Sequence, residues 1–169
     1  AALESLGWPD GAGVRSPRAP TYAFAVLLLC RLGRREEATA RFAARPSAGE
    51  IGDGLAARDW GEVCLMLDRP EEALSYLRAG LRLRSDDPWC HAHAGAACLR
   101  LNQPPSALAH FEAATTLLPD EIGPAVGRAA ALLDLDRAKE ALAVIAPWED
   151  RAGADTPRFR RLLFRARMA

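Results

Sequence analysis

The stretch HAGAACLRLNQPPSALAHFEAATTLLP, from His93 to Pro119, repeats the layout of DWGEVCLMLDRPEEALSYLRAGLRLRS, which begins 34 residues earlier at Asp59. In both stretches, small and apolar residues recur at helical spacing on either side of a proline-marked turn. The matching pairs include Gly61 and Gly95, Cys64 and Cys98, and Leu65 and Leu99. A period of this length indicates stacked helical hairpins, because one hairpin cannot bury its apolar face alone.

The period divides most of the chain into four units, expected at 19–52, 54–87, 88–121 and 122–155. The first unit is the loosest copy, since it needs one extra residue, Asp53, before the second begins. A segment rich in glycine and proline, 1–18, precedes the units and is expected to be loop. Aspartate, proline and asparagine mark the turns, and the order of Asp68 and Glu71 predicts a capping box there.

The last segment, 156–169, is expected to be a basic helix that caps the stack. Thr156 should be its N-cap and Pro157 should lie in its first turn. One face carries the apolar residues Phe159, Leu162, Leu163 and Ala166, and arginines crowd the rest. The alternative is a basic helix that binds an acidic partner or a membrane surface.

The composition argues against a nucleic-acid-binding protein and against a membrane-spanning one. Lysine plus arginine and aspartate plus glutamate each number 22, so the net charge is zero, and no nucleic-acid partner is expected. The longest apolar run, Tyr22 to Cys30, is too short to span a bilayer, which takes about 20 residues. The four cysteines are too poorly spaced to pair easily, so reduced thiols in a cytoplasmic protein are expected.

The chain resembles the tetratricopeptide repeat family. Five positions of the 88–121 unit fit the family's pattern of small, aromatic and proline residues: Gly95, Ala107, Phe111, Ala114 and Pro119. In the unit before it, Gly61, Ala73, Leu77 and Gly80 fit and Ser85 replaces the proline. The resemblance implies an all-α, right-handed superhelical stack of helix-turn-helix hairpins whose first helices line an inner wall.

That wall implies a protein-binding groove. Its candidate residues also share helix faces by their spacing of three, four and seven, and they are Leu55, Arg58, Glu62, Leu65, Met66, Trp89, Ala92, His93, Ala96, Leu99, Arg100, Val126, Ala130 and Leu133. Because the stripe is mostly apolar, we expect it to bind an extended or helical apolar segment of a partner protein, with the two arginines orienting it. The alternative is that part of the stripe packs against the next helix or a terminal segment.

No catalytic, cofactor or metal site is expected. His91 and His93 lie two residues apart and therefore point about 200° apart around a helix. Cys90 and His93 could share a face, but two ligands do not make a zinc site, and His110 lies on another helix. No phosphate-binding glycine loop, HExxH or GxSxG motif is present, so an enzyme is not expected.

Three functions stay open at this point. The first is a binding module or adaptor. In size and apolar groove it is similar to the tetratricopeptide chaperones of type III secretion translocators, although it has four units rather than three and is not acidic. The second is a scaffold that self-associates into a homo-oligomer. The third is a cofactor- or metal-carrying protein.

Overall fold

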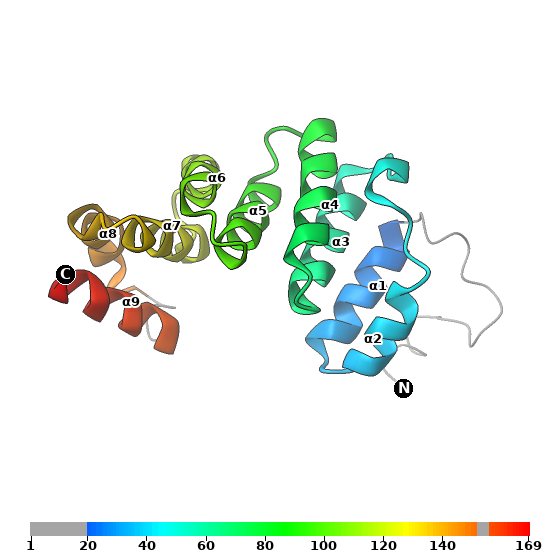
Figure 1. Ribbon diagram of the computed structural model, residues 1–169, viewed down its shortest axis with the longest axis horizontal. Helices are drawn as coiled ribbons and strands as arrows, with labels where there is room; N and C mark the ends of the chain where they lie inside the picture. Colours follow the sequence, from blue (N-terminus) through cyan, green and yellow to red (C-terminus); the bar gives the residue numbers. More distant parts are fainter. Residues whose placement is uncertain (1–19, 152–155) are drawn as a thin grey trace.

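The computed structural model describes residues 20–151 and 156–169, and within these ranges all regular secondary structure is helical. Helical hairpins follow one another along the long axis of the molecule (Figure 1). The elements are α1 (Pro20–Arg31), α2 (Arg35–Phe42), the 3₁₀ turn η2 (Ala48–Glu50), α3 (Gly54–Met66), α4 (Pro70–Leu83), α5 (Pro88–Arg100), α6 (Pro104–Leu117), α7 (Ile122–Asp134), α8 (Ala138–Ile145), the 3₁₀ turn η3 (Ala146–Trp148) and α9 (Pro157–Met168). The predicted all-α stack of hairpins is confirmed. Segment 1–18 lies outside the described residues.

The 34-residue period fixes where the helices begin. The first helices of the four hairpins begin at Pro20, Gly54, Pro88 and Ile122, and the second helices of the last three at Pro70, Pro104 and Ala138. Each of these steps is 34 residues. Only α2 departs, because it begins at Arg35, 35 residues before α4. The first hairpin therefore has a shorter first helix, and α2 together with the segment after it spans one residue more than α4 with its own following segment.

All four hairpins turn through the same backbone conformation. One residue in each turn has a positive φ, and these residues are Gly33, Asp68, Asn102 and Asp136, with φ of 74°, 61°, 53° and 58°. The next amide donates to the carbonyl five residues back, as in Arg69 N to Cys64 O at 2.8 Å and Gln103 N to Cys98 O at 2.9 Å. This is the Schellman arrangement, in which aspartate and asparagine tolerate the left-handed conformation.

The helix caps differ in part from the prediction. The capping box predicted at Asp68 is wrong, because Asp68 occupies the left-handed turn position and α4 has Arg69 at its N-cap, with no side-chain cap. The caps lie instead before the first helices, where Asp87 Oδ1 accepts from the Cys90 amide at 2.9 Å. Thr156 caps α9, as predicted, by accepting from the Phe159 amide at 3.2 Å.

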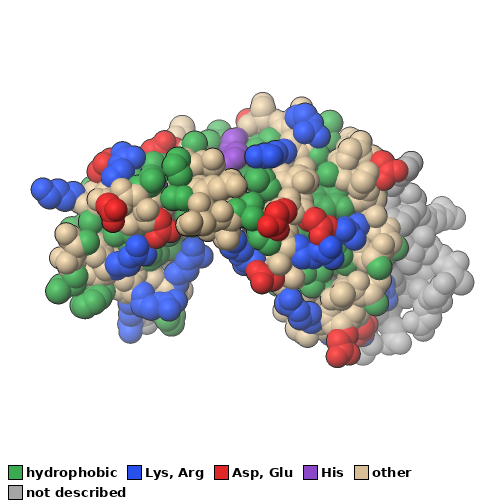
Figure 2. All heavy atoms as spheres, in the orientation of Figure 1, with side chains coloured by type: hydrophobic (Ala, Val, Ile, Leu, Met, Phe, Trp, Pro, Cys, Tyr) green, Lys and Arg blue, Asp and Glu red, His purple; other side chains and the backbone are tan. Residues whose placement is uncertain are grey.

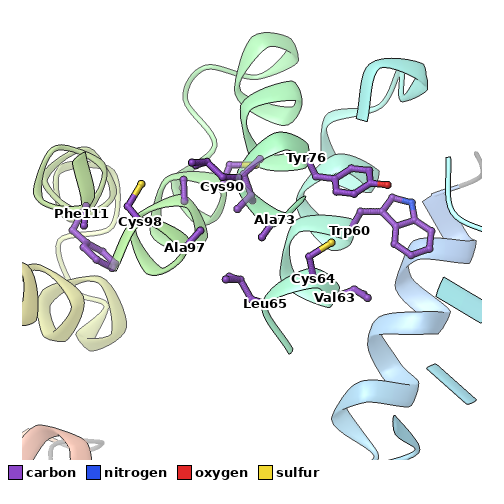
Figure 3. Close-up of a cluster of buried hydrophobic side chains, with 14 of the residues drawn as sticks. Trp60, Val63, Cys64, Leu65, Ala73, Tyr76, Cys90, Ala97, Cys98 and Phe111 are labelled. Atoms are coloured by element: carbon purple, nitrogen blue, oxygen red, sulfur yellow. The ribbon is translucent and has the colours of Figure 1, made fainter. Parts of the chain in front are cut away.

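Aromatic side chains fill the core of the first two hairpins (Figure 3). Trp60 is 1% exposed and its ring lies 5.9 Å from Tyr22, 5.8 Å from Phe42 and 6.2 Å from Tyr76, measured between centroids. Such tilted and edge-on pairs stabilise a core beyond the burial of their area.

A single ring joins the third and fourth hairpins. Phe111 of α6 lies between Gly95 of α5 and Gly127 of α7. A Cβ atom built on Gly95 would lie 2.8 Å from Phe111 Cε2, and one on Gly127 would lie 2.2 Å from Cε1. Both positions therefore favour glycine, because a side chain at either one would overlap the ring unless the ring moved.

Helix α9 packs against α7 and α8. It buries Phe159, Leu162 and Ala166, and Arg165 Nη2 reaches Asp134 Oδ1 at 3.0 Å. Its other side leaves Phe164 and Met168 exposed, at 67% and 71%. No helix within the described ranges is long and apolar enough to cross a bilayer.

The four cysteines are free thiols, as their spacing predicts, and three of them are buried. Burial raises the pKa of Cys64 and of Cys90 to about 12. These thiols therefore stay protonated at neutral pH and act as small apolar core residues.

Candidate protein-binding groove

The first helices of the first three hairpins, α1, α3 and α5, pack side by side and leave an open groove of about 430 Å³. Each helix contributes side chains, and the lining consists of Phe24, Leu27, Arg31, Arg58, Asp59, Glu62, Trp89 and His93. The space-filling view shows acidic and basic side chains side by side over α1 and α3 (Figure 2). The groove thus combines apolar and charged chemistry.

Two large aromatic side chains in the groove are only partly covered. Phe24 of α1 is 55% exposed and Trp89 of α5 is 39% exposed. They lie on the outer two of the three helices, with α3 between them. Aromatic surface that is exposed in this way is stabilised when an apolar group covers it.

The charges on α3 are already balanced within the protein. Arg58 Nη2 lies 3.1 Å from Asp59 Oδ1, and Arg58 Nη1 lies 3.8 Å from Asp87 Oδ2. Both carboxylates are buried. Burial raises the pKa of Asp59, and the hydrogen bond and charge of Arg58 oppose this rise without cancelling it.

A second ionic group joins all three helices. Glu62 of α3 accepts a hydrogen bond from Arg31 Nη2 of α1 at 2.7 Å, and its other oxygen lies 3.4 Å from His93 Nε2 of α5. Burial alone would raise the pKa of Glu62, but hydrogen bonds from His93 and Arg31, with their charges, lower it to about 2. Glu62 is therefore ionised at neutral pH and its oxygens are occupied.

Four of the sequence-predicted residues line this groove: Arg58, Glu62, Trp89 and His93. Four others are buried and offer little surface to a partner, and these are Leu65, Val126, Ala130 and Leu133. The partly buried Met66, Ala92, Ala96 and Leu99 and the exposed Leu55 lie outside the lining. The buried members follow the alternative of packing against neighbouring helices. Leu65 lies on α3, which packs against α4 and α5, and the other three lie on α7, which packs against α5 and α9.

The arginines are more constrained than predicted. Arg100 donates to the Leu65 carbonyl and lies 3.5 Å from Asp68 Oδ1, while Arg58 is held by Asp59. Both guanidinium groups already contact protein oxygens, so a partner would have to compete for them. The wall is also less apolar than predicted, since charged side chains make up much of its lining.

Sequence reasoning missed four lining residues: Phe24, Leu27, Arg31 and Asp59. The signal that finds Phe24 is the period itself, because Phe24 lies 34 residues before Arg58. The prediction aligned the first unit on its second helix, which is shifted by one residue, and so left the face of α1 unassigned.

No cluster of three or more histidine, cysteine, aspartate or glutamate side chains suited to a metal ion occurs among the described residues. The groove contains ionisable groups, but they pair with one another rather than converging on an open position. The exposed apolar surface of the groove is therefore that of the two rings, Phe24 and Trp89.

The hairpin stack and its groove define the tetratricopeptide-repeat fold, and solved structures bear this out. No protein-family model and no curated protein sequence matches the chain. By structure it is similar to YrrB, described as a TPR protein with an unusual peptide-binding site, with a TM-score of 0.68 and 19% identity over 90% of this chain and 76% of YrrB.

Two further structures share the fold. The thermophilic TPR protein TTC0263 of Thermus thermophilus has a TM-score of 0.68 and 21% identity over 99% of this chain and 95% of its own. The complex of the TPR2AB domain of yeast Sti1 with pHSP90 has a TM-score of 0.61 and 18% identity over 81% of this chain and 54% of that one. These likenesses establish the fold.

Proposed function

We propose that the chain is a protein-binding module that holds an apolar segment of a partner protein, extended or helical, in the groove of α1, α3 and α5. The observation that carries this proposal is the pair of exposed rings, Phe24 and Trp89, in a groove whose charged groups are already paired. Aromatic anchors of this kind commonly dominate the free energy of protein interfaces.

The structural neighbours support a peptide-like ligand. YrrB is described as having a peptide-binding site, and the Sti1 domain is described in complex with pHSP90. A chaperone or adaptor that holds one segment of a client fits a groove of this size. The four free cysteines support a reducing, cytoplasmic setting for that role.

Burial of apolar surface should carry most of the binding free energy. The carboxylate of Glu62 is held by Arg31 and His93, so a partner charge would have to displace an existing contact. An apolar side chain that covers Phe24 or Trp89 displaces only water. We therefore expect salt to weaken binding only modestly.

The test compares two groove variants with one control. Trp89→Ala and Phe24→Ala remove the exposed rings, and Phe164→Ala removes a still more exposed ring from α9, far along the chain from the groove. The parent and the three variants are each used to capture proteins from the native host. A candidate partner is a protein that the parent and Phe164→Ala both capture and that neither groove variant captures. Peptides from those proteins are then titrated against all four forms.

Truncating an aromatic anchor commonly costs about 2 kcal/mol, or about 30-fold in affinity. We expect that loss for Trp89→Ala, with circular dichroism confirming an unchanged fold. If folded Trp89→Ala and Phe24→Ala bind the peptides as the parent does, the groove is not the binding surface.

Self-association is the second candidate, and one observation favours it. Phe164 and Met168 lie one helical turn apart on α9 and are the two most exposed large apolar side chains in the described ranges. Light scattering separates the two functions: a scaffold gains mass with its own concentration, and Phe164→Ala abolishes the gain. A binding module gains mass only when its partner is added.

A further inference from the structure

Two histidines from different helices meet outside the groove. His91 of α5 and His110 of α6 bring their Nδ1 atoms to 3.1 Å, with ring centroids 5.4 Å apart and planes inclined at 46°. Neither side chain is fully buried. Histidine surface is visible between α6 and the α4–α5 connection (Figure 2). The hairpin thus places two nitrogen ligands together on an accessible face.

The proton positions in this pair follow from a third contact. His91 Nε2 lies 3.1 Å from the Ser85 carbonyl oxygen. A carbonyl only accepts hydrogen bonds, so Nε2 of His91 carries a proton and donates it. In the neutral imidazole, Nδ1 of His91 then has a free lone pair, and Nδ1 of His110 must donate to it. The proton between the two rings is therefore bonded to Nδ1 of His110 and directed at the lone pair of Nδ1 of His91.

This arrangement is the one that prepares a histidine for a metal ion. Ligating histidines commonly donate their other ring N–H to a carbonyl, which fixes the ring and directs the free lone pair. With metal–nitrogen bonds of about 2.0–2.1 Å, a separation of 3.1 Å corresponds to an N–metal–N angle of about 95–100°. That angle lies between the square-planar and tetrahedral values, so one ion fits between the nitrogens once both rings turn their lone pairs from the N–N line toward it.

We propose that His91 and His110 supply two of the ligands of a divalent transition metal of the zinc and nickel class. The metal replaces the shared proton: Nδ1 of His110 loses it to solvent, and Nε2 of the same ring takes one up, so no net proton is released. Both nitrogens then donate lone pairs to the ion, and water or a partner side chain completes its coordination. Magnesium and calcium do not fit, because they prefer oxygen ligands.

The surroundings of the pair set its strength. Burial lowers the pKa of His110, and its neighbours His91 and Arg78 lower it further. The positive charge of Arg78 also opposes a cation. With no third ligand of the histidine, cysteine or carboxylate kind clustered there in the described residues, the site is open and its ion exchangeable.

The experiment uses the untagged full chain with its thiols reduced. Nickel and zinc chlorides are titrated by calorimetry, with magnesium chloride as the control ion. We expect one saturable equivalent of nickel or zinc, a higher melting temperature in its presence, and no response to magnesium. Loss of either ligand, in His91→Ala or His110→Ala, should weaken binding by at least the roughly 10–100-fold that loss of an outer-shell partner costs.

Two further variants and one spectrum make the test specific. His93→Ala removes the third histidine and should leave the metal affinity unchanged, whereas Arg78→Gln should increase it. Nitrogen-15 spectra of the parent should show zinc shifting the Nδ1 resonances of both His91 and His110 and the Nε2 resonance of His110, which gains a proton, whereas Nε2 of His91 stays protonated and should shift little. The proposal is overturned by an absence of saturable binding, by unchanged affinity in folded His91→Ala, or by a zinc shift confined to other residues.

Discussion

The contact of Phe111 with two glycines gives the sharpest stability prediction. Replacing Gly127 by alanine places a Cβ atom 2.2 Å from Cε1 of the ring, whereas ordinary contact begins at 3.4 Å. The ring must therefore move by about 1 Å, the shortfall between these two distances. It cannot move freely, because it is buried and its other edge faces Gly95.

Two opposing terms set the size of the effect. Alanine is favoured over glycine in a helix by about 1 kcal/mol, and overpacking a well-filled core costs about 1–3 kcal/mol. Because the ring is held on both sides, we expect the upper part of the overpacking range and a net loss of about 1–2 kcal/mol. For a chain of this size, each kcal/mol lowers the melting temperature by about 2–4 °C.

Gly123 supplies a matched control in the same helix. A Cβ atom there meets nothing within 4 Å, so Gly123→Ala should be neutral or stabilise the fold by up to about 1 kcal/mol. Phe111→Leu should lower the free energy of unfolding by less in the Gly127→Ala protein than in the parent. The difference between the two losses is the coupling energy, which we expect to be about 0.5–3 kcal/mol. The assay is urea unfolding followed by circular dichroism. A Gly127→Ala protein as stable as the parent, or additive double-variant effects, would refute the packing argument.

Three other predictions follow from caps, charges and thiols. The pKa of the Glu62 carboxyl falls from 4.5 to about 2 on folding, so its contribution to stability is complete above pH 4.5 and is lost as the pH drops toward 2. Glu62→Gln should therefore flatten the pH dependence of the free energy of urea unfolding between these two values. Parallel profiles for the parent and the variant would contradict this. Asp87→Ala removes the N-cap of α5 and should lower the free energy of unfolding by about 1–2 kcal/mol in the same assay. Asp120→Ala, at an exposed site, should lower it little. Equal losses would contradict the capping argument. Alkylation should modify the half-buried Cys30 before the three buried thiols, and peptide mapping identifies the modified residues. The reverse order would contradict the burial of these three thiols.

The sequence predicts the hairpins well because their determinants are local. Small residues at Gly61, Gly95 and Ala107 permit close helix packing, and turn residues recur at one interval. These constraints repeat, so each copy supports the others. The capping box failed because the pattern of Asp68 and Glu71 fits both an N-cap and a left-handed turn, and only the backbone distinguishes the two.

The groove is less predictable because it depends on which helices pack together. Spacing places Leu65 and Leu133 on the wall face, but it does not reveal that neighbouring helices cover them. In the same way, angles around one helix separate His91 from His93, yet they give no information about His110 on the next helix. Contacts between elements decide both cases.

The Phe111 contact also has a consequence for the order of the repeats. Leu77 in the 54–87 unit and Phe111 in the 88–121 unit hold the same place. In the unit that follows each of them, the sixth residue is His93 after the unit of Leu77 and Gly127 after the unit of Phe111. A second copy of 88–121 inserted after the first would bring a histidine to the place where the ring needs a glycine. The units therefore share one backbone design without being interchangeable, and their succession along the chain is determined by the sizes of the side chains that meet at each junction.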